Sequence, residues 1–225
     1  MAKVHEKQKV IALRRKGHTY KEIMKRVPNV AKGTISIWCN SYKFTPYEVK
    51  KIERGAQIGR DRARLAAAKT NHNRRLERDQ KTSEEAARLF DKYKKDPLFI
   101  LGVSLYWGEG TKTFRRFQFT NSDPKMIKTM IIWMKKYLKI PEIAIKPRLY
   151  VHIHENNTVD EYEEFWSKYL EIQKSKFHKT IIKKTDFDFN KKDDYKGCIR
   201  IDAPKVDPWV TVTAWQRLLV EKLKI

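Results

Sequence analysis

Apolar residues are sparse from residue 45 to residue 95, and this gap constrains the fold more than any other feature of the sequence. A stretch with so few apolar side chains cannot build a hydrophobic core of its own. Its Ala, Arg, Glu and Lys content nevertheless favours helix. We therefore expect a basic connector of one or two long helices over residues 45–95, between folded regions at residues 1–44 and 96–225.

Positive charge is concentrated in the first part of the chain. Residues 1–95 contain 26 basic and 10 acidic residues, whereas residues 96–225 contain 24 and 17, giving a net charge of +23. This surplus exceeds what solubility requires and favours a polyanionic partner. Double-stranded DNA is the first expectation. An acidic membrane is a weaker one, because no strongly apolar face accompanies the basic residues.

Composition also excludes several classes of protein. Hydrophobic residues make up 40% of the chain, too many for a disordered protein. No run of 18 apolar residues predicts a membrane span, and the first residues lack the apolar core of a signal peptide. Two isolated cysteines, Cys39 and Cys198, exclude a disulfide framework and a Cys-based zinc finger. We expect a cytoplasmic protein, nucleoid-associated if bacterial, with no membrane partner and no small-molecule substrate.

Residues 1–44 alternate between helices and breaks. Apolar residues at helical spacing predict a first helix, which Gly17 ends. Thr19 and Glu22 have the spacing of a capping box at the start of a short second helix. The pair Pro28-Asn29 then breaks the chain before a third helix. This order is that of a helix-turn-helix, although an ordinary three-helix unit without a ligand would share it.

The stretch RRKGHTYKEIMKRVPNVAKGTISIWCN resembles the helix-turn-helix of resolvases and related recombinases. In that motif the last helix enters the major groove with its first residues near base edges. The resemblance implies that Lys32, Thr34 and Ser36 approach bases. Arg26 and Lys43 would hold phosphates.

The connector has two interpretations, which can hold together. It is a solvated spacer, or it is an arm that follows the phosphate backbone of DNA. The basic residues of such an arm are Arg60, Arg62, Arg64, Lys69, Arg74 and Arg75.

Residues 97–110 predict a buried helix that ends in a carboxylate. Pro97 suits the first turn, and the next ten residues are apolar almost all round. Ser104 and Gly108 are four residues apart and share one face, where small side chains let another backbone approach. Glu109 follows directly, between two glycines.

The segment SLYWGEG, residues 104–110, resembles the signature helix of the LAGLIDADG homing endonucleases. In that family two such helices pack together at the active site, and the acid that ends each helix binds a divalent metal. The resemblance implies that Glu109 is a catalytic metal ligand, with Ser104 and Gly108 at a homodimer interface. It also implies that Asn121 helps to position water. Ser104 in place of a glycine and the bulky pair Tyr106-Trp107 depart from the family pattern.

Elementary electrostatics favours a cation beside Glu109. A carboxylate at a helix C-terminus faces the negative end of the helix dipole, and a second copy would add repulsion. Two such carboxylates stay ionised most readily with a cation between them. Mg²⁺, or Mn²⁺ in its place, suits carboxylate and phosphate oxygens. Lys112 could stabilise phosphate charge nearby. A polar turn without a metal remains the alternative.

The rest of the C-terminal region predicts strands and helices. Strands are expected near residues 116–120, 143–153, 180–184 and 198–202, and helices over 124–138, 159–171 and 211–223. The LAGLIDADG core runs helix, two strands, helix, two strands, helix. Residues 97–171 fit that order if the first two strand regions are hairpins, but single strands fit the pattern equally well.

One face of the expected sheet is basic and aromatic, as a DNA-reading sheet requires. Apolar residues fall on odd positions from Ile143 to Ile153, and polar residues fall on even positions. The expected DNA contacts in this region are Arg115, Arg116, Gln118, Lys146, Arg148, Tyr150, His152 and His154. The two histidines could instead bind zinc, but no third ligand is evident.

Together these features predict an α+β protein with an N-terminal helix-turn-helix, a basic helical connector and a C-terminal LAGLIDADG-like domain with an antiparallel sheet. The expected function is that of a homodimeric, Mg²⁺-dependent, site-specific DNA endonuclease. A DNA-binding transcriptional regulator on a degenerate LAGLIDADG domain is the alternative, which the departures at residues 104, 106 and 107 favour. A recombinase accessory or RNA-binding protein is a third class.

Overall fold

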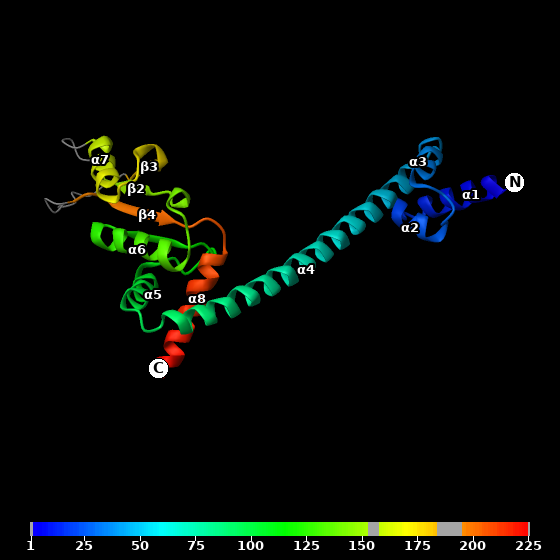
Figure 1. Ribbon diagram of the computed structural model, residues 1–225. Coiled ribbons are helices and arrows are strands. Elements are labelled where there is room, and N and C mark those ends of the chain that lie inside the picture. The colour runs from blue at the N-terminus through cyan, green and yellow to red at the C-terminus, as the bar shows by residue number, and fades with distance from the viewer. Residues whose placement is uncertain (1, 153–157, 184–194, 225) are drawn as a thin grey trace. The chain divides into compact units, whose positions relative to one another are not determined.

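The computed structural model describes residues 2–152, 158–183 and 195–224, which form an α+β protein (Figure 1). The chain divides into two compact units, Met1–Leu76 and Glu77–Ile225. Each unit has a hydrophobic core of its own. The long helix α4, Pro46–Tyr93, contributes residues to both units. Across the described residues, no helix has the length and apolar character needed to cross a membrane.

Three short helices and the start of α4 make up the first unit. They are α1 Ala2–Arg15, α2 Tyr20–Arg26 and α3 Lys32–Asn40. The expected capping box forms: the Glu22 amide donates to Thr19 Oγ1 over 3.3 Å, and the Thr19 amide donates to the Glu22 carboxylate over 2.9 Å. Ile23 and Ile35 are fully buried between the helices. Local capping and a small apolar core therefore fix this three-helix unit.

A glycine contact seats the start of α4 on the turn after α1. Gly17 has a φ of +90°, and a Cβ on Gly55 would lie only 1.9 Å from the Gly17 carbonyl oxygen. Arg15 forms an ion pair with Glu48, the buried carboxylate near the start of α4. Gly55 therefore permits the backbones to meet, although from sequence it only weakens a helix.

The connector forms one continuous helix, which resolves the choice between one helix and two. Residues 61–78 are exposed on every side. The final turns pack into the second unit, where Ala86 and Phe90 are buried.

The second unit contains a four-stranded sheet and the helices that follow α4. Its elements are α5 Pro97–Glu109, β1 Gln118–Asn121, α6 Pro124–Tyr137, β2 Arg148–Val151, α7 Val159–Leu170, β3 His178–Ile182, β4 Cys198–Asp202 and α8 Asp207–Leu223. Short 3-10 turns lie at Glu142–Ala144 and Lys174–Lys176. Figure 1 shows α6 along one face of the sheet.

The sheet is mixed, so the expectation of an antiparallel sheet is wrong in one strand pair. The strand order is β1-β4-β2-β3. β4 runs antiparallel to both β1 and β2, whereas β2 and β3 are parallel. A parallel pair needs a crossover connection, and α7 lies between β2 and β3 in the chain.

Each of the first two strand regions holds one strand among the described residues, so the two-hairpin layout does not form over residues 97–171. Before β1 the chain loops through Phe114 and Arg115, which both have a left-handed backbone. Before β2 it makes a 3-10 turn that leaves Ile143 exposed, and Pro147 directly precedes the strand. These turns shorten both strands to four residues.

The apolar face of the sheet packs on a core rich in tryptophan. Trp133, Trp166 and Trp215 are fully buried. Trp133 Nε1 donates to the Phe99 carbonyl over 3.1 Å, so the polar edge of the ring is satisfied. The buried residues on the sheet's apolar face are Phe119, Leu149, Val151, Ile199 and Ile201.

Asp96 fixes the start of α5. Its side chain accepts from the Leu98 amide as the N-cap. Lys136 and the Tyr137 hydroxyl, both of α6, donate to the same carboxylate over 2.8 and 2.6 Å. These two donors lower the pKa of Asp96 to about 2. One carboxylate thus ties α5 to α6 while it caps α5.

Candidate nucleic-acid interface

The outward face of α3 carries most of the residues expected to contact bases. Lys32 is exposed in the first turn, whereas Thr34 and Ser36 are half-buried. Ile37 is 68% exposed and lies one turn after Gly33 and Thr34 on α3. Ile37 was not selected from the sequence, and it lies off the buried face that Ile35 and Cys39 form. Such a side chain can contact a thymine methyl group.

The first unit places two further cations beside this helix. Arg26 ends α2 and contacts His18, and Lys43 follows α3; both are exposed. The first turn of α3 has no side-chain cap, and a Cβ on Gly33 would meet no atom within 4 Å. The start of α3 is therefore open to close approach by a ligand.

Four arginines of α4 share one helix face. At 100° per residue, Arg60, Arg64, Arg74 and Arg75 fall within an arc of about 100°, whereas Arg62 and Lys69 point to the other side. Among the described residues none of the four forms an ion pair, whereas Arg62 lies 3.8 Å from Glu22. The expected arm thus has a face of arginines whose charge no carboxylate of the described residues neutralises, although Arg60 forms a hydrogen bond with Gln57 and Arg75 forms one with His72.

The polar face of the sheet gathers basic and aromatic side chains from three strands. Arg148 of β2 lies directly opposite Arg200 of β4. Arg200 Nε is 3.0 Å from Asp202, and its guanidinium lies 5.5 Å from the Tyr150 ring centre. Like charges directly opposite in a sheet are destabilising, so this face suits an anionic ligand. Gln118 and Thr120 of β1 continue the face.

Sequence reasoning missed Arg200 and Asp202. The signal was present, because residues 198–202 alternate between polar even positions and apolar odd positions, as residues 143–153 do. Sequence reasoning also missed His178 of β3, which lies beside Arg148 on the side of β2 opposite to Arg200.

The remaining residues expected to contact DNA differ in their exposure and in whether they form ion pairs. Lys146 and Arg116 are exposed, whereas Arg115 forms an ion pair with Asp79 and is half-buried. His152 is half-buried after β2, and its backbone amide donates to the Tyr195 hydroxyl over 3.3 Å. His154 lies outside the described residues, so the histidine pair stays a prediction.

Glu109 is the last residue of α5 and is exposed. An isolated bridge between Gly110 and Phe119 holds this helix end beside β1. Lys112 Nζ donates to the Gly110 and Tyr106 carbonyls over 2.8 and 3.3 Å. This ammonium group offsets the negative end of the helix dipole close to Glu109.

Asn121 is not bonded to this group. It ends β1, and its Oδ1 accepts from the Asp123 amide over 2.8 Å at the turn before α6. It makes no hydrogen bond with Glu109 or Lys112 in the described structure. A role in positioning water stays a prediction.

A single chain offers few ligands for a metal at this place. Across the described parts of the chain, no three His, Cys, Asp or Glu side chains are grouped to hold a metal ion. The Gly110 carbonyl is already an acceptor for Lys112. Glu109 supplies one carboxylate, and a second carboxylate from another copy, together with phosphate oxygens of a ligand, would complete the oxygen donors that Mg²⁺ prefers.

The exposed face of α5 has the small residues that such a pairing needs. Leu101 and Leu105 are four residues apart, as are Ser104 and Gly108, so the four residues share one face of α5. Ser104 and Gly108 are exposed, and a Cβ on Gly108 would meet nothing within 4 Å. Another backbone could therefore approach this face closely.

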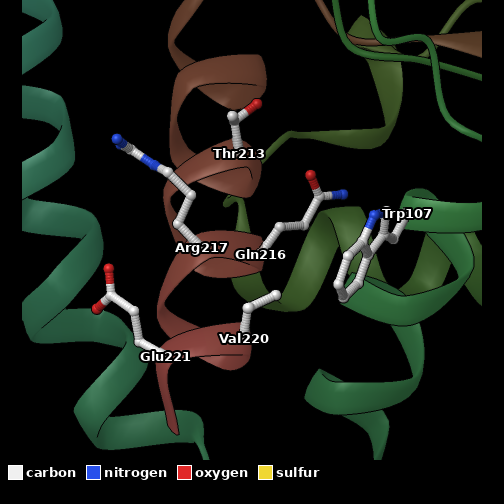
Figure 2. A pocket seen from close by; sticks show the side chains of 6 residues that line it. All are labelled: Trp107, Thr213, Gln216, Arg217, Val220 and Glu221. Carbon is white, nitrogen blue, oxygen red and sulfur yellow. The ribbon is translucent and has the colours of Figure 1, made fainter. Parts of the chain in front are cut away.

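A shallow pocket of about 350 Å³ lies beside this face, between α5 and α8 (Figure 2). Trp107 lines one side and is 42% exposed. In Figure 2 the side chains of Gln216 and Val220 extend toward Trp107, whereas those of Arg217 and Glu221, which also line the pocket, extend away from Trp107. Arg217 and Glu221 are the ionisable residues in its lining, and neither forms a hydrogen bond or ion pair with another lining residue in the described structure.

No protein-family model, curated protein or solved structure matches this chain.

Proposed function

We propose that this protein binds double-stranded DNA at specific sites and cleaves it as a homodimer that depends on Mg²⁺ or Mn²⁺. The proposal rests chiefly on one juxtaposition. The exposed carboxylate of Glu109 ends a helix held beside β1, the edge strand of a sheet whose polar face carries Arg148, Arg200 and Tyr150. Cations and an aromatic ring suit the DNA strand, and the carboxylate suits the metal.

In the proposed dimer two α5 helices meet along Ser104 and Gly108, which brings together two Glu109 carboxylates. A bound Mg²⁺ stabilises charge on the attacking and leaving oxygens of a phosphodiester. Lys112 keeps the helix end electrostatically favourable for Glu109. The recognition helix α3 and the sheet face select the site.

A DNA-binding regulator without cleavage is the second candidate. Two observations favour it: among the described residues no group of three His, Cys, Asp or Glu side chains includes Glu109, and Lys112 donates to the neighbouring Gly110 carbonyl. Both candidates need duplex DNA and differ only in whether the strand is cut.

The test is a randomised duplex library incubated with the protein in Mg²⁺ and, in parallel, in EDTA. Bound molecules and new ends are sequenced. We expect a roughly symmetric site with defined ends that appear only with the metal. Enrichment of the same site without new ends would support the regulator, and no enrichment of any duplex would overturn both candidates.

The arginine face of α4 leads to a salt-dependence prediction. In the variant Arg64→Gln/Arg75→Gln, we expect the slope of log affinity against log salt to fall by about 1.8, since each lost phosphate contact removes about 0.9. The control, Arg62→Gln/Lys69→Gln, removes the same charge from the other side of the helix and should change the slope little. Equal slopes in the two variants would show that α4 does not present this face to DNA.

The proposed dimer contact is tested by Gly108→Ala. Gly108 is exposed inside a helix and its Cβ meets nothing, so alanine should stabilise the monomer by about 0.5–1 kcal/mol. If a second α5 packs closely on this face, the same methyl group must weaken the dimer. We expect a higher melting temperature at low protein concentration and a larger dimer dissociation constant by sedimentation. A dissociation constant equal to that of wild type would remove this face from the dimer interface.

A further inference from the structure

The loop between α5 and β1 presents an aromatic side chain to solvent. Phe114 is 85% exposed, more than any other large apolar side chain in the described parts of the chain. Phe114 and Arg115 have φ values of +62° and +50°, a left-handed backbone that two successive non-glycine residues rarely adopt. An exposed phenylalanine on a strained turn requires an explanation beyond chance.

Contacts on both sides hold the base of this loop. Arg115 forms an ion pair with Asp79, and its guanidinium lies 5.2 Å from the Trp209 ring centre. Trp209 Nε1 donates to the Thr111 carbonyl over 3.3 Å. Tyr106, fully buried in α5, directs its hydroxyl to the Thr111 and Arg116 carbonyls at 3.2 and 3.4 Å. These anchors lie on both sides of Phe114 in the sequence, whereas the Phe114 side chain itself is largely exposed.

The chemistry around Phe114 indicates which partner covers it. The sequence Lys112-Thr113-Phe114-Arg115-Arg116 places three cations within two residues of the ring. Lys112 and Arg116 are exposed, so their charge reaches the same solvent. An aromatic ring among cations suits a nucleic acid, because the ring can stack on a base while the cations contact the phosphates. A lipid surface would need a wider apolar face.

We propose that Phe114 inserts between adjacent base pairs of bound DNA and bends the duplex there. This inference rests on the proposed function, because it requires bound duplex DNA. The loop that carries Phe114 leads directly into β1 of the proposed DNA-binding sheet, and the Thr111 amide donates to the Gln118 carbonyl over 2.9 Å. Proteins that kink DNA commonly use a phenylalanine or leucine wedge in this manner. Pyrimidine–purine steps unstack most easily, so the inserted step should be TA or CA/TG.

The test uses the full chain in Ca²⁺, which replaces Mg²⁺ so that the duplex is not cut, and duplexes of the selected site. 2-Aminopurine replaces each adenine in turn, and its fluorescence rises where a base loses its stacking partner. We expect a rise at one step with wild type and none with Phe114→Ala. Affinity should fall by about 5- to 150-fold in that variant, the range for one base–aromatic stack.

Two further variants make the result specific. Phe114→Leu keeps an apolar wedge and should retain both the fluorescence rise and the bend measured by energy transfer between the duplex ends. Ile143→Ala removes another exposed apolar side chain of the second unit, 72% exposed, and should change neither. Wild-type fluorescence and affinity in Phe114→Ala would overturn the inference.

The outcomes separate this inference from the proposed function. If wild type binds the duplex but no 2-aminopurine position responds, only the insertion of Phe114 fails. If wild type binds no duplex, the proposed function fails and the inference fails with it. Phe114-dependent binding to phosphatidylserine vesicles, with no response from DNA, would assign the loop to a membrane instead.

Discussion

Replacing Glu109 by Gln is expected to lower the single-turnover rate of DNA cleavage by about 10³-fold, while duplex affinity in Ca²⁺ stays within about threefold of wild type. The amide has the size and shape of the carboxylate but lacks the charge that holds a divalent cation. Glu109 is exposed at the end of α5, so the exchange leaves no buried polar group unsatisfied. The substitution should therefore lower the cleavage rate and leave the stability of the fold unchanged.

The matched control is Glu142→Gln, which removes another exposed carboxylate of the second unit. Glu142 forms an ion pair with Lys135 and lies in the 3-10 turn before β2. Its cleavage rate should equal that of wild type. If Glu109→Gln cleaved at the wild-type rate, Glu109 would not be a metal ligand. If wild type bound its site but never cut it, the regulator would be the better proposal.

Local signals predicted the helices well because the groups that begin and end a helix are neighbours in the chain. The capping box of Thr19 and Glu22 forms as expected. The aspartate and proline that begin α6, Asp123 and Pro124, take the N-cap and first-turn positions. Of the last two strands, β4 has the expected bounds, whereas β3 begins at His178, two residues before the expected start.

The sheet topology could not be predicted, because it depends on contacts between distant segments. Nothing in residues 178–182 alone states that β3 runs parallel to β2, or that β4 lies between β1 and β2. The same limit applies to Gly55, whose close contact with Gly17 joins residues 38 positions apart. A glycine that weakens a helix in isolation here permits the helix to dock.

Only part of the candidate site could be predicted, because some of its residues are brought together by contacts between distant segments. Periodicity identified Arg148 and Tyr150 on one strand face, but only strand pairing shows that Arg200 lies opposite Arg148. The motif helix identified Glu109, whereas the bond from Lys112 back to the Gly110 carbonyl needed the fold. The left-handed backbone at Phe114 and Arg115 has no signal in the sequence, because glycine and asparagine, the residues that usually mark such a turn, are absent from both positions.

Small residues lie on two faces of α5: Gly102 is on the buried face, and Ser104 and Gly108 are on the exposed face. The variant Gly102→Ala tests the packing of the buried face. A Cβ on Gly102 would lie 2.1 Å from Trp133 Cδ1 and 2.2 Å from Trp133 Nε1. That ring is fully buried, donates to the Phe99 carbonyl and meets the Trp215 ring edge-on at 5.7 Å, so it cannot move aside without disturbing the core. We expect the free energy of unfolding to fall by about 3 kcal/mol, despite alanine's better helix propensity.

Five of the six tryptophans lie in the second unit, so denaturant unfolding followed by tryptophan fluorescence reports mainly on that unit. Gly108→Ala is the matched control, since it makes the same exchange on the same helix where the methyl group meets nothing. Its unfolding midpoint should equal or exceed that of wild type under monomeric conditions. If Gly102→Ala lowers the midpoint and Gly108→Ala does not, the inner face of α5 requires a glycine beside Trp133. The outer face then tolerates a methyl group in the monomer, as expected if it is exposed until a partner binds. A wild-type midpoint for Gly102→Ala would contradict the close packing of α5 on α6.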